Sequence, residues 1–480
     1  MCTRCVLSMR WLLAIVIASV SASSVHPSER QGPAKRPNIL LLLSDDQRPD
    51  AIGALGNELI NTPNLDELAR SGTVFTRATC ANPICTPSRA EIISGCTSFR
   101  NGVLDFGRQI KPELALWPQT MLDAGYHTWF VGKWHNRGKP SVHGFEDTLG
   151  LFGGGGGQWW KDQVDWKGSS ITGYRGWIFQ TEDGKKFPEK GVGLTADISA
   201  EFANAAIEFI ERKTEKPWFL QVSFTAPHDP LIMPTGFESM YEAAAMTLPK
   251  NFLSEHPFDH GNFDGRDEKL LPWPRKPELV REVIAMYYAV ISHMDQQIGR
   301  IIQLLRDTNQ IGNTIIIFSS DHGLGVGSHG LRGKQSMYEH TVGVPLIFHG
   351  PGIPKGAQRD AQCYLRDLFP TTCELAGIKI PKTVEGRSLA SVLAGKEKSV
   401  YDEIYGYFRD KQRMIRSDRW KLVHYPHLDK YQLFDLANDP DELKNVVEEA
   451  EFQAVATDLK ARLRRWQTKV GDPVLIEAKD

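Results

Sequence analysis

The sequence predicts an α/β protein whose mixed, mostly parallel sheet is sandwiched by helices and followed by a smaller C-terminal α+β domain. Four short apolar runs are typical of buried parallel strands. They are residues 39–43, 128–131, 218–224 and 314–318. Between the last two runs, apolar residues from 283 to 305 recur at the spacing of one helix face. This alternation of strands and helices favours a parallel sheet covered on both faces.

The pattern changes after Pro345. Residues 350–356 are rich in Gly and Pro, and short strand-like pieces follow at 403–408 and 420–425. An amphipathic stretch at 452–470 comes near the end of the chain. We therefore expect a large domain at residues 36–397 and a C-terminal α+β subdomain at residues 398–480.

The charge balance excludes a strong overall field. The 480 residues include 56 basic and 58 acidic side chains, for a formal net charge of -2. A protein that binds nucleic acid or an anionic membrane through its overall charge is more basic than this. We therefore expect no nucleic-acid partner, and any anion site must be local.

The N-terminus has the pattern of an export signal. Arg4 and Arg10 precede an apolar run at residues 11–20, and small residues at 21–22 are suited to cleavage. The run is too short to span a bilayer. We expect a signal peptide at residues 1–22 and an exported protein, periplasmic or secreted, without stable membrane insertion; an uncleaved anchor is the alternative.

The cysteine count points to one cysteine with a special function. Of the 7 cysteines, five follow the signal: Cys80, Cys85, Cys96, Cys363 and Cys373. An odd number in an oxidising compartment indicates that one has another function, and Cys85 is the candidate. The other four are hypothesised to form Cys80–Cys96 and Cys363–Cys373 bridges.

Polar side chains follow each of the four predicted strands. In chain order they are Asp45 and Asp46, Lys133 and His135, His228 and Asp229, and Asp321 and His322. Ligands of such sheets bind beyond the carboxyl ends of the strands. We therefore expect these carboxylates, imidazoles and the ammonium group to share one edge.

Cys85 precedes a predicted helix. Pro87 favours a first turn, Thr86 can cap it, and Gly95 is suited to its end. The unpaired N–H groups of a helix N-terminus favour anions. Cys85 is thus expected just ahead of a helix N-terminus, placed for attack on an anionic ester.

The run Cys85-Thr86-Pro87-Ser88-Arg89 resembles the sulfatase signature, in which the cysteine is oxidised to formylglycine. Residues 83–95 fit the longer signature, with Ser94 unusual near its end, and residues 125–135 resemble a second one. The likeness continues through residues 321–323 and 333–336, and so covers residues 38–349. It implies an alkaline phosphatase-like fold and a formylglycine-dependent type I sulfatase that a formylglycine-generating enzyme matures.

A calcium site is implied by the same resemblance. Asp45, Asp46, Asp321 and His322 occupy the family's ligand positions for one Ca²⁺, with the formylglycine oxygen at Cys85. Carboxylates are hard oxygen ligands that calcium prefers. His322 stands where asparagine is usual, so magnesium or manganese stays open.

The remaining site residues also take their roles from the resemblance. Arg89 would hold the formylglycine, and His135 would hydrogen-bond its hydroxyl. Lys133 and Lys334 would contact the sulfate. Either His228 or Lys334 would protonate the leaving alcohol. Among neighbouring histidines, a substrate role for His329 stays open, and His340 is assigned none.

The substrate is expected to be a sulfate ester, with a sulfated polysaccharide or oligosaccharide preferred. Tryptophans at 159, 160, 166 and 177 either form platforms for sugar rings or pack an insertion. Choline sulfate and aryl sulfates stay open. The rivals are a phosphonate monoester or phosphodiester hydrolase of the same superfamily and a non-catalytic glycan-binding homologue. Retention of Cys85, Arg89, Lys133 and His228 disfavours the last.

Overall fold

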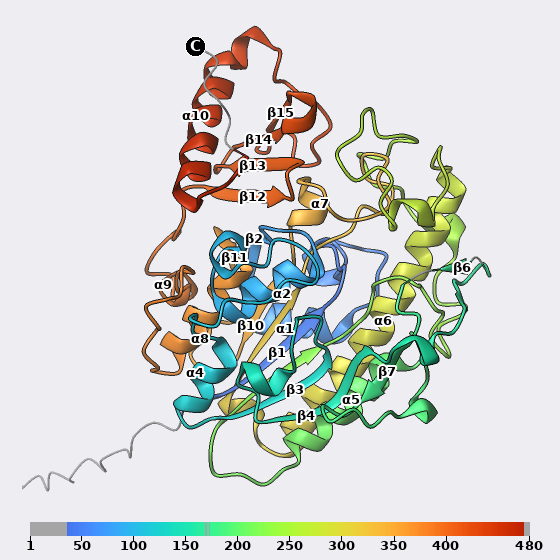
Figure 1. Cartoon of the computed structure of the whole chain (residues 1–480), viewed down its shortest axis with the longest axis vertical. Helices are drawn as coiled ribbons and strands as arrows, with labels where there is room; N and C mark the ends of the chain where they lie inside the picture. The colour runs from blue at the N-terminus through green and yellow to red at the C-terminus, as the bar shows by residue number, and fades with distance from the viewer. Residues whose placement is uncertain (1–35, 169, 172, 475–480) are drawn as a thin grey trace, which may run out of the picture. The chain divides into compact units, whose positions relative to one another are not determined.

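A nine-stranded sheet organises the protein in the computed structural model, which describes residues 36–474 apart from 169 and 172 (Figure 1). Across the sheet the strands are β11 (Ala357–Tyr364), β2 (Thr73–Thr79), β10 (Leu346–His349), β9 (Thr314–Ser320), β1 (Asn38–Ser44), β8 (Trp218–Ser223), β3 (His127–Lys133), β4 (Asp147–Gly154) and β7 (Trp177–Gln180). The export signal expected at residues 1–22 lies outside the described residues.

The four predicted strands form the centre of this sheet. They correspond to β1, β3, β8 and β9, which lie in the order β9-β1-β8-β3 and pair in parallel throughout. Every residue of β1, β8 and β9 is buried, which explains why these strands are mostly apolar. Antiparallel pairing of β10 with β9 and of β7 with β4 makes the sheet mixed, as predicted.

Helices cover both faces of the sheet (Figure 1). Leu41 of β1 shares a core with α2 (Cys85–Ser94), α4 (Trp117–Asp123) and α8 (Leu368–Leu375). Leu40 and Leu42 point to the other face, with α1 (Pro63–Ser71), α5 (Ile198–Ile210) and α6 (Pro277–Asp307). The shorter elements are α3 (Ser98–Asn101), α7 (Glu339–Val342), α9 (Ala390–Leu393), β5 (Gln163–Val164) and β6 (Ser170–Ile171).

The C-terminal domain is a small antiparallel sheet covered by one helix. Its strands are β12 (Ile404–Phe408), β13 (Gln412–Arg416), β14 (Trp420–Tyr425) and β15 (Lys430–Asp435), paired in sequence order. Helix α10 (Gln453–Val470) buries Leu459 and Leu463 in the same core. The predicted α+β domain is confirmed, and its boundary at residue 398 stays a prediction.

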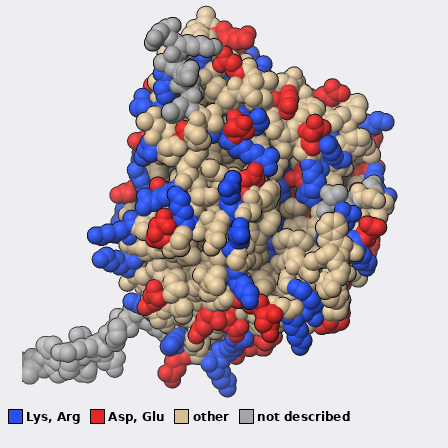
Figure 2. All heavy atoms as spheres, in the orientation of Figure 1, with Lys and Arg blue, Asp and Glu red and all other residues tan. Residues whose placement is uncertain are grey.

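The surface mixes both signs of charge. Lys and Arg are interspersed with Asp and Glu on the face in Figure 2, in line with the formal net charge of -2. Within residues 36–474, no helix combines the length and the apolar composition needed to cross a membrane.

The disulfide hypothesis is wrong. All five described cysteines are free and buried. The Cys80 thiol donates to the Asn82 carbonyl at 3.2 Å, and the Cys96 thiol donates to the Thr383 carbonyl at 3.1 Å. Each of these two thiols thus has its own backbone acceptor instead of a sulfur partner.

Buried histidines lie where the C-terminal sheet packs against the large domain. His329 stacks on Tyr338 with ring centroids 3.9 Å apart, and Tyr338 donates to the Gln432 side chain of β15 at 2.9 Å. His256 bonds the His329 carbonyl through Nδ1 at 2.9 Å, while its buried Nε2 has no partner. Burial lowers the pKa of His256 to about 4, although that hydrogen bond and Asp259 oppose the shift. These contacts assign His329 and His256 to packing between the domains.

We expect His256 to make the fold sensitive to acid. Because its folded-state pKa lies below the ordinary 6.5, the unfolded chain takes up the proton first, and stability falls as the pH drops from 6.5 towards 4. This one group accounts for at most about 3 kcal/mol of that loss. In His256→Gln, the difference in unfolding free energy between pH 7 and pH 4 should shrink accordingly in urea titrations. The control is the exposed His427→Gln; an unchanged difference in His256→Gln would contradict the assignment.

Candidate active site

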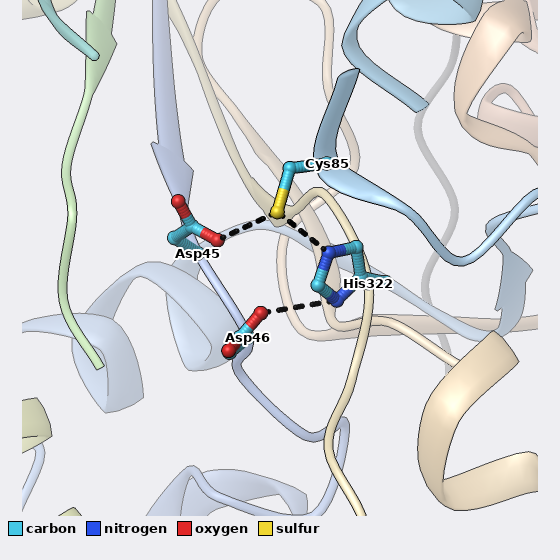
Figure 3. A group of neighbouring side chains, drawn as sticks. All are labelled: Asp45, Asp46, Cys85 and His322. Atoms are coloured by element: carbon cyan, nitrogen blue, oxygen red, sulfur yellow. Dashed lines mark hydrogen bonds and ion pairs between the residues drawn. The ribbon is translucent and has the colours of Figure 1, made fainter. Parts of the chain in front are cut away.

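The carboxyl ends of the central strands bring the predicted polar residues to one edge. Asp45 and Asp46 follow β1, Lys133 ends β3, and Asp321 follows β9. Four of the collected side chains, Asp45, Asp46, Cys85 and His322, point towards one another in Figure 3. The parallel register of β9, β1, β8 and β3 is what places these strand ends together.

Cys85 is the first residue of α2, whereas the sequence predicted it just ahead of the helix. Thr86 does not cap the helix, because its hydroxyl donates to the His135 carbonyl at 2.9 Å. Gly95 ends the helix as predicted, with a φ of 64° and its N–H on the Glu91 carbonyl. The Cys85 sulfur lies 3.6 Å from Asp45 Oδ1, 3.3 Å from His322 Nε2 and 3.4 Å from Lys334 Nζ.

Arg89 ties the helix of Cys85 to two strand ends. Its Nε donates to Asp321 Oδ2 at 2.9 Å, and its Nη2 donates to Asp45 Oδ2 at 3.2 Å. A third bond from Nη1 reaches the Lys133 carbonyl at 3.1 Å. The guanidinium is 2% exposed, so these charge-assisted bonds form away from solvent and fix the Cys85 segment against β1, β3 and β9.

The two adjacent aspartates differ in protonation. Burial favours a raised pKa for Asp45, but Lys133 and Arg89 outweigh it and hold the pKa well below the ordinary value. Lys133 also contacts Asp45 directly. Burial raises the pKa of Asp46 to about 7, against the opposing effect of Lys334. A permanent carboxylate therefore stands beside one that takes up a proton near neutral pH.

Lys334 connects Asp46 to Cys85. Its Nζ donates to the two Asp46 oxygens at 2.8 and 3.1 Å and lies 3.9 Å from Asp267. Burial lowers its pKa, but Asp46 and the Cys85 side chain outweigh burial and raise it well above the ordinary value. Lys334 is thus a buried, permanently charged donor at the base of the site.

His228 and His135 of the site both favour the neutral form. Burial and Lys334 lower the pKa of His228 well below the ordinary value, and burial and Lys133 do the same for His135. The Nδ1–H of His228 donates to the Asp229 carbonyl at 2.6 Å. Its Nε2 lies 3.9 Å from Asp46 Oδ2. His228 therefore presents a free Nε2 to the site.

One group of side chains is suited to a cation. Ligand atoms of Asp45, Asp46, Cys85 and His322 all lie within 4.8 Å of one another and are buried. Burial lowers the pKa of His322, but Asp321 and Cys85 outweigh it and raise the pKa to about 9. The protons held by His322 and Asp46 balance buried negative charge, a task that a divalent ion would take over. Asp321 lies beside this group, accepting from Arg89 and from the Asp46 N–H at 3.3 Å.

A second group of possible ligands contains Asp46, His228 and Asp229. Arg266 already binds both Asp229 oxygens at 2.9 Å, and Lys334 binds both oxygens of Asp46. Cations of the chain itself therefore occupy the position that a second metal ion would take.

Tyr174 is a site residue that the sequence did not reveal. Its hydroxyl donates to Asp45 Oδ2 at 3.3 Å, and Lys133 Nζ lies 5.2 Å from its ring centroid. It lies in the segment that carries the tryptophans at 159, 160, 166 and 177, and in the sequence only these tryptophans indicated a role in substrate binding. Of those, Trp177 lines the cavity over Cys85, whereas Trp166 packs against the core beside α6 and Trp160 is 64% exposed.

The C-terminal domain reaches the site through Gln412, another residue without a sequence signal. Its side chain accepts from the Met337 N–H at 3.0 Å and donates to the Gln335 and His260 carbonyls at 2.9 and 2.8 Å. These bonds hold the segment that carries Lys334. Gln335 itself adopts a φ of 72°, a backbone conformation that side-chain-bearing residues rarely adopt.

A cavity of about 400 Å³ opens above Cys85. Its walls combine the predicted His135, His228 and Lys334 with residues that the sequence did not single out. The latter include Phe106, Tyr174, Asn262, Arg266, Asp267, Gln335 and Arg409. The cavity lining thus combines polar, partly cationic side chains with aromatic ones, next to the buried charged residues around Cys85.

Comparisons with known proteins identify the family of this chain. The chain matches the sulfatase family model over residues 37–378 and a second model, described as N-sulphoglucosamine sulphohydrolase, C-terminal, over residues 327–469. It is 30% identical to an arylsulfatase of Clostridium perfringens over 87% of this chain and 92% of the relative. The chain therefore belongs to the sulfatase family and is a sulfuric ester hydrolase.

Other relatives extend the comparison. An N-acetylglucosamine-6-O-sulfatase of Bacteroides thetaiotaomicron is 27% identical over 96% of this chain and 91% of its own. A structure solved in complex with its substrate D-glucosamine-2-N,6-O-disulfate superposes with a TM-score of 0.76 at 25% identity, covering 92% and 99% of the two chains. A phosphonate monoester hydrolase of Agrobacterium radiobacter shares the fold, with a TM-score of 0.75 at 23% identity over 91% and 96%.

We expect the Tyr174 hydroxyl to contribute to catalysis through Asp45. In Tyr174→Phe, the loss of a hydrogen bond to a buried carboxylate should lower kcat/KM for an aryl sulfate by about tenfold. The control is Tyr241→Phe, since the Tyr241 hydroxyl bonds Ser292 and the Asn61 N–H instead of the carboxylates of the site. Equal kcat/KM values for Tyr174→Phe and wild type would exclude this role.

Proposed function

We propose that this sulfatase hydrolyses sulfate esters of carbohydrates, using formylglycine made from Cys85 and one bound calcium ion. The observation that carries the proposal is the position of Cys85. Its sulfur, which stands in for a formylglycine oxygen, lies between Asp45, His322 and Lys334 at the base of the cavity. When formed, formylglycine hydrate supplies one hydroxyl as nucleophile and a second whose deprotonation releases sulfate. A formylglycine-generating enzyme is the partner that this requires.

Asp45, Asp46, Asp321 and His322 are the proposed ligands of the ion. Bound calcium would neutralise sulfate oxygens and lower the pKa of the nucleophilic hydroxyl. The mostly carboxylate ligand set favours a hard cation. Magnesium and manganese meet the same requirement, and His322 is the ligand least typical of calcium.

The surrounding side chains would position the reacting groups. Arg89 holds the nucleophile segment through three bonds, and Lys133 and Lys334 supply positive charge for the sulfate oxygens. His135 lines the same cavity as Cys85 and would hydrogen-bond the nucleophile's hydroxyl. Together they form a preorganised anion site, in which little reorganisation is needed as charge develops.

Two residues are candidates for the general acid. The raised pKa of Lys334 favours its protonated form, whereas the lowered pKa of His228 means that it must take up a proton on Nε2 before it can act. His228 nevertheless lines the cavity above Cys85, with its Nε2 3.9 Å from Asp46 Oδ2. If His228 is the acid, its loss should matter more for a poor leaving group than for a good one, and this difference provides a test.

We expect His228→Ala to discriminate between leaving groups. A sugar alcohol is a poor leaving group that needs protonation, so kcat for a sugar sulfate should fall at least about a hundredfold. An activated aryl sulfate needs little protonation and should lose much less. Stopped assays of released sulfate measure both substrates. Equal losses would remove His228 from the acid role and leave Lys334.

The carbohydrate preference draws on the relatives and on the cavity. One similar protein is named an N-acetylglucosamine-6-O-sulfatase, and another was solved with D-glucosamine-2-N,6-O-disulfate as its substrate. Phe106 and Trp177 also give the cavity aromatic walls that suit sugar rings. Relatives described as arylsulfatase and choline-sulfatase keep small sulfates as alternatives.

We also propose, from the N-terminal sequence pattern, that the protein is exported to the periplasm or secreted.

A substrate panel tests this function. Mature protein is assayed for released sulfate with defined sugar sulfates, choline sulfate, an aryl sulfate and a matched phosphonate monoester. We expect at least one sugar sulfate to give the highest kcat/KM and Cys85→Ala to abolish its turnover. A preference for choline sulfate or for the phosphonate would overturn the carbohydrate proposal.

A further inference from the structure

A second cavity adjoins the one above Cys85. It measures about 620 Å³ and shares Phe106, His135 and Trp177 with the cavity of the catalytic site. Its other walls come from the segment after β3, from the end of β4, and from β7 with the turn that follows it. The two hollows therefore meet at one aromatic boundary.

The aromatic boundary is accessible to a ligand. Phe106 is 45% exposed, although its ring lies 5.6 Å from that of His135. Trp177 meets the same imidazole edge-on at 5.4 Å and is half-buried. Rings that are packed on one side and open on the other are suited to the apolar faces of sugars.

The polar wall of the second cavity has unused hydrogen-bonding capacity. Asn136 Oδ1 is buried without a partner, while its Nδ2 makes one long contact of 3.4 Å with the Trp134 carbonyl. A buried carbonyl oxygen without a donor is costly, so rotation of the Asn136 amide towards the cavity, where a ligand hydroxyl would satisfy this oxygen, would be favourable. Arg137 and Lys139 are exposed along the same wall, and Glu182 is already paired with Ser141. The hydrogen bonds from Ser141 leave the charge of Glu182 in place, but the two cations outnumber this one carboxylate.

We propose that this second cavity binds the neighbouring saccharide unit of a sulfated oligosaccharide whose sulfated residue lies over Cys85. The inference rests on the proposed carbohydrate sulfatase function and adds chain-length selectivity to it. Aromatic faces, an unpaired acceptor and exposed cations together match a hydroxylated, acidic sugar. The cavity volume falls within the range of ligand pockets that hold molecules of this size.

Gly154 offers a way to close this cavity. It lies in β4 opposite Trp177 of β7, so a side chain added there would project from the same face of the sheet as Trp177. A Cβ at Gly154 meets no atom within 4 Å, and the same is true of Gly157 outside the cavity. Gly154→Trp is therefore a steric block, and Gly157→Trp is its matched control.

The test compares kcat/KM for a monosaccharide and for disaccharides that contain it. The first probe is the monosaccharide D-glucosamine-2-N,6-O-disulfate. The other two are disaccharides of this sugar, one with a uronic acid at its reducing side and one with a uronic acid at its non-reducing side. The same comparison is then made for the best sugar sulfate of the substrate panel. We expect the wild type to prefer one disaccharide by at least about tenfold. Gly154→Trp should bring this ratio close to one, and Gly157→Trp should keep the wild-type ratio.

A milder variant protects the test against a folding defect. Asn136→Ala removes the unpaired oxygen without adding bulk and should lower the disaccharide preference several-fold. A wild-type ratio near one, or a preference that survives both Gly154→Trp and Asn136→Ala, would overturn this inference alone. Turnover of an aryl sulfate without turnover of any sugar sulfate would overturn the carbohydrate function and this inference together.

Discussion

The structure depends on a cluster of buried opposite charges at the carboxyl edge of the sheet. Asp45, Asp46 and Asp321 meet Arg89, Lys133 and Lys334 with almost no solvent contact. Removing charges from water is costly, and only close pairing offsets the cost. The raised pKa values of Asp46, about 7, and His322, about 9, favour protons in this cluster. A bound divalent cation would displace these protons and supply positive charge for a sulfate ester.

Parallel strand pairing makes this cluster possible. Each strand of the β9-β1-β8-β3 group ends at the same edge, so the chain directions alone bring together residues that lie far apart in sequence. The helix of Cys85 then enters from the side and is held by Arg89. The C-terminal domain completes the arrangement through Gln412, which bonds the backbone on the C-terminal side of Lys334. Local chemistry in the site thus depends on contacts from both domains.

The sequence predicted the parts that periodicity and motif spacing encode. The runs of β1, β8 and β9 are apolar at almost every position because both faces of the sheet are covered, and β12 and β14 were recognisable as strands. The edge strand β11 and the next-to-edge strand β4 lacked that pattern, because several of their residues contact solvent. Thr86 was assigned to a helix cap because its residue type fits one, but the nearby His135 carbonyl accepts its hydroxyl instead.

Residues that reach the site through long-range contacts gave no signal. Tyr174, Arg266 and Gln412 come from an insertion, an irregular segment and the second domain. Their roles depend on tertiary packing that no local pattern encodes. The disulfide hypothesis failed for a related reason, since the parity of the cysteine count carries no information on the distance between thiols.

The central claim is that a carbonyl made from the Cys85 side chain is the catalytic group. Its most direct test is peptide mass spectrometry of residue 85 in preparations matured to different extents, with the specific activity of each preparation measured in parallel. The account predicts that activity rises in proportion to the fraction of formylglycine and vanishes with the unconverted thiol. Full activity in a preparation whose Cys85 is entirely thiol would contradict it.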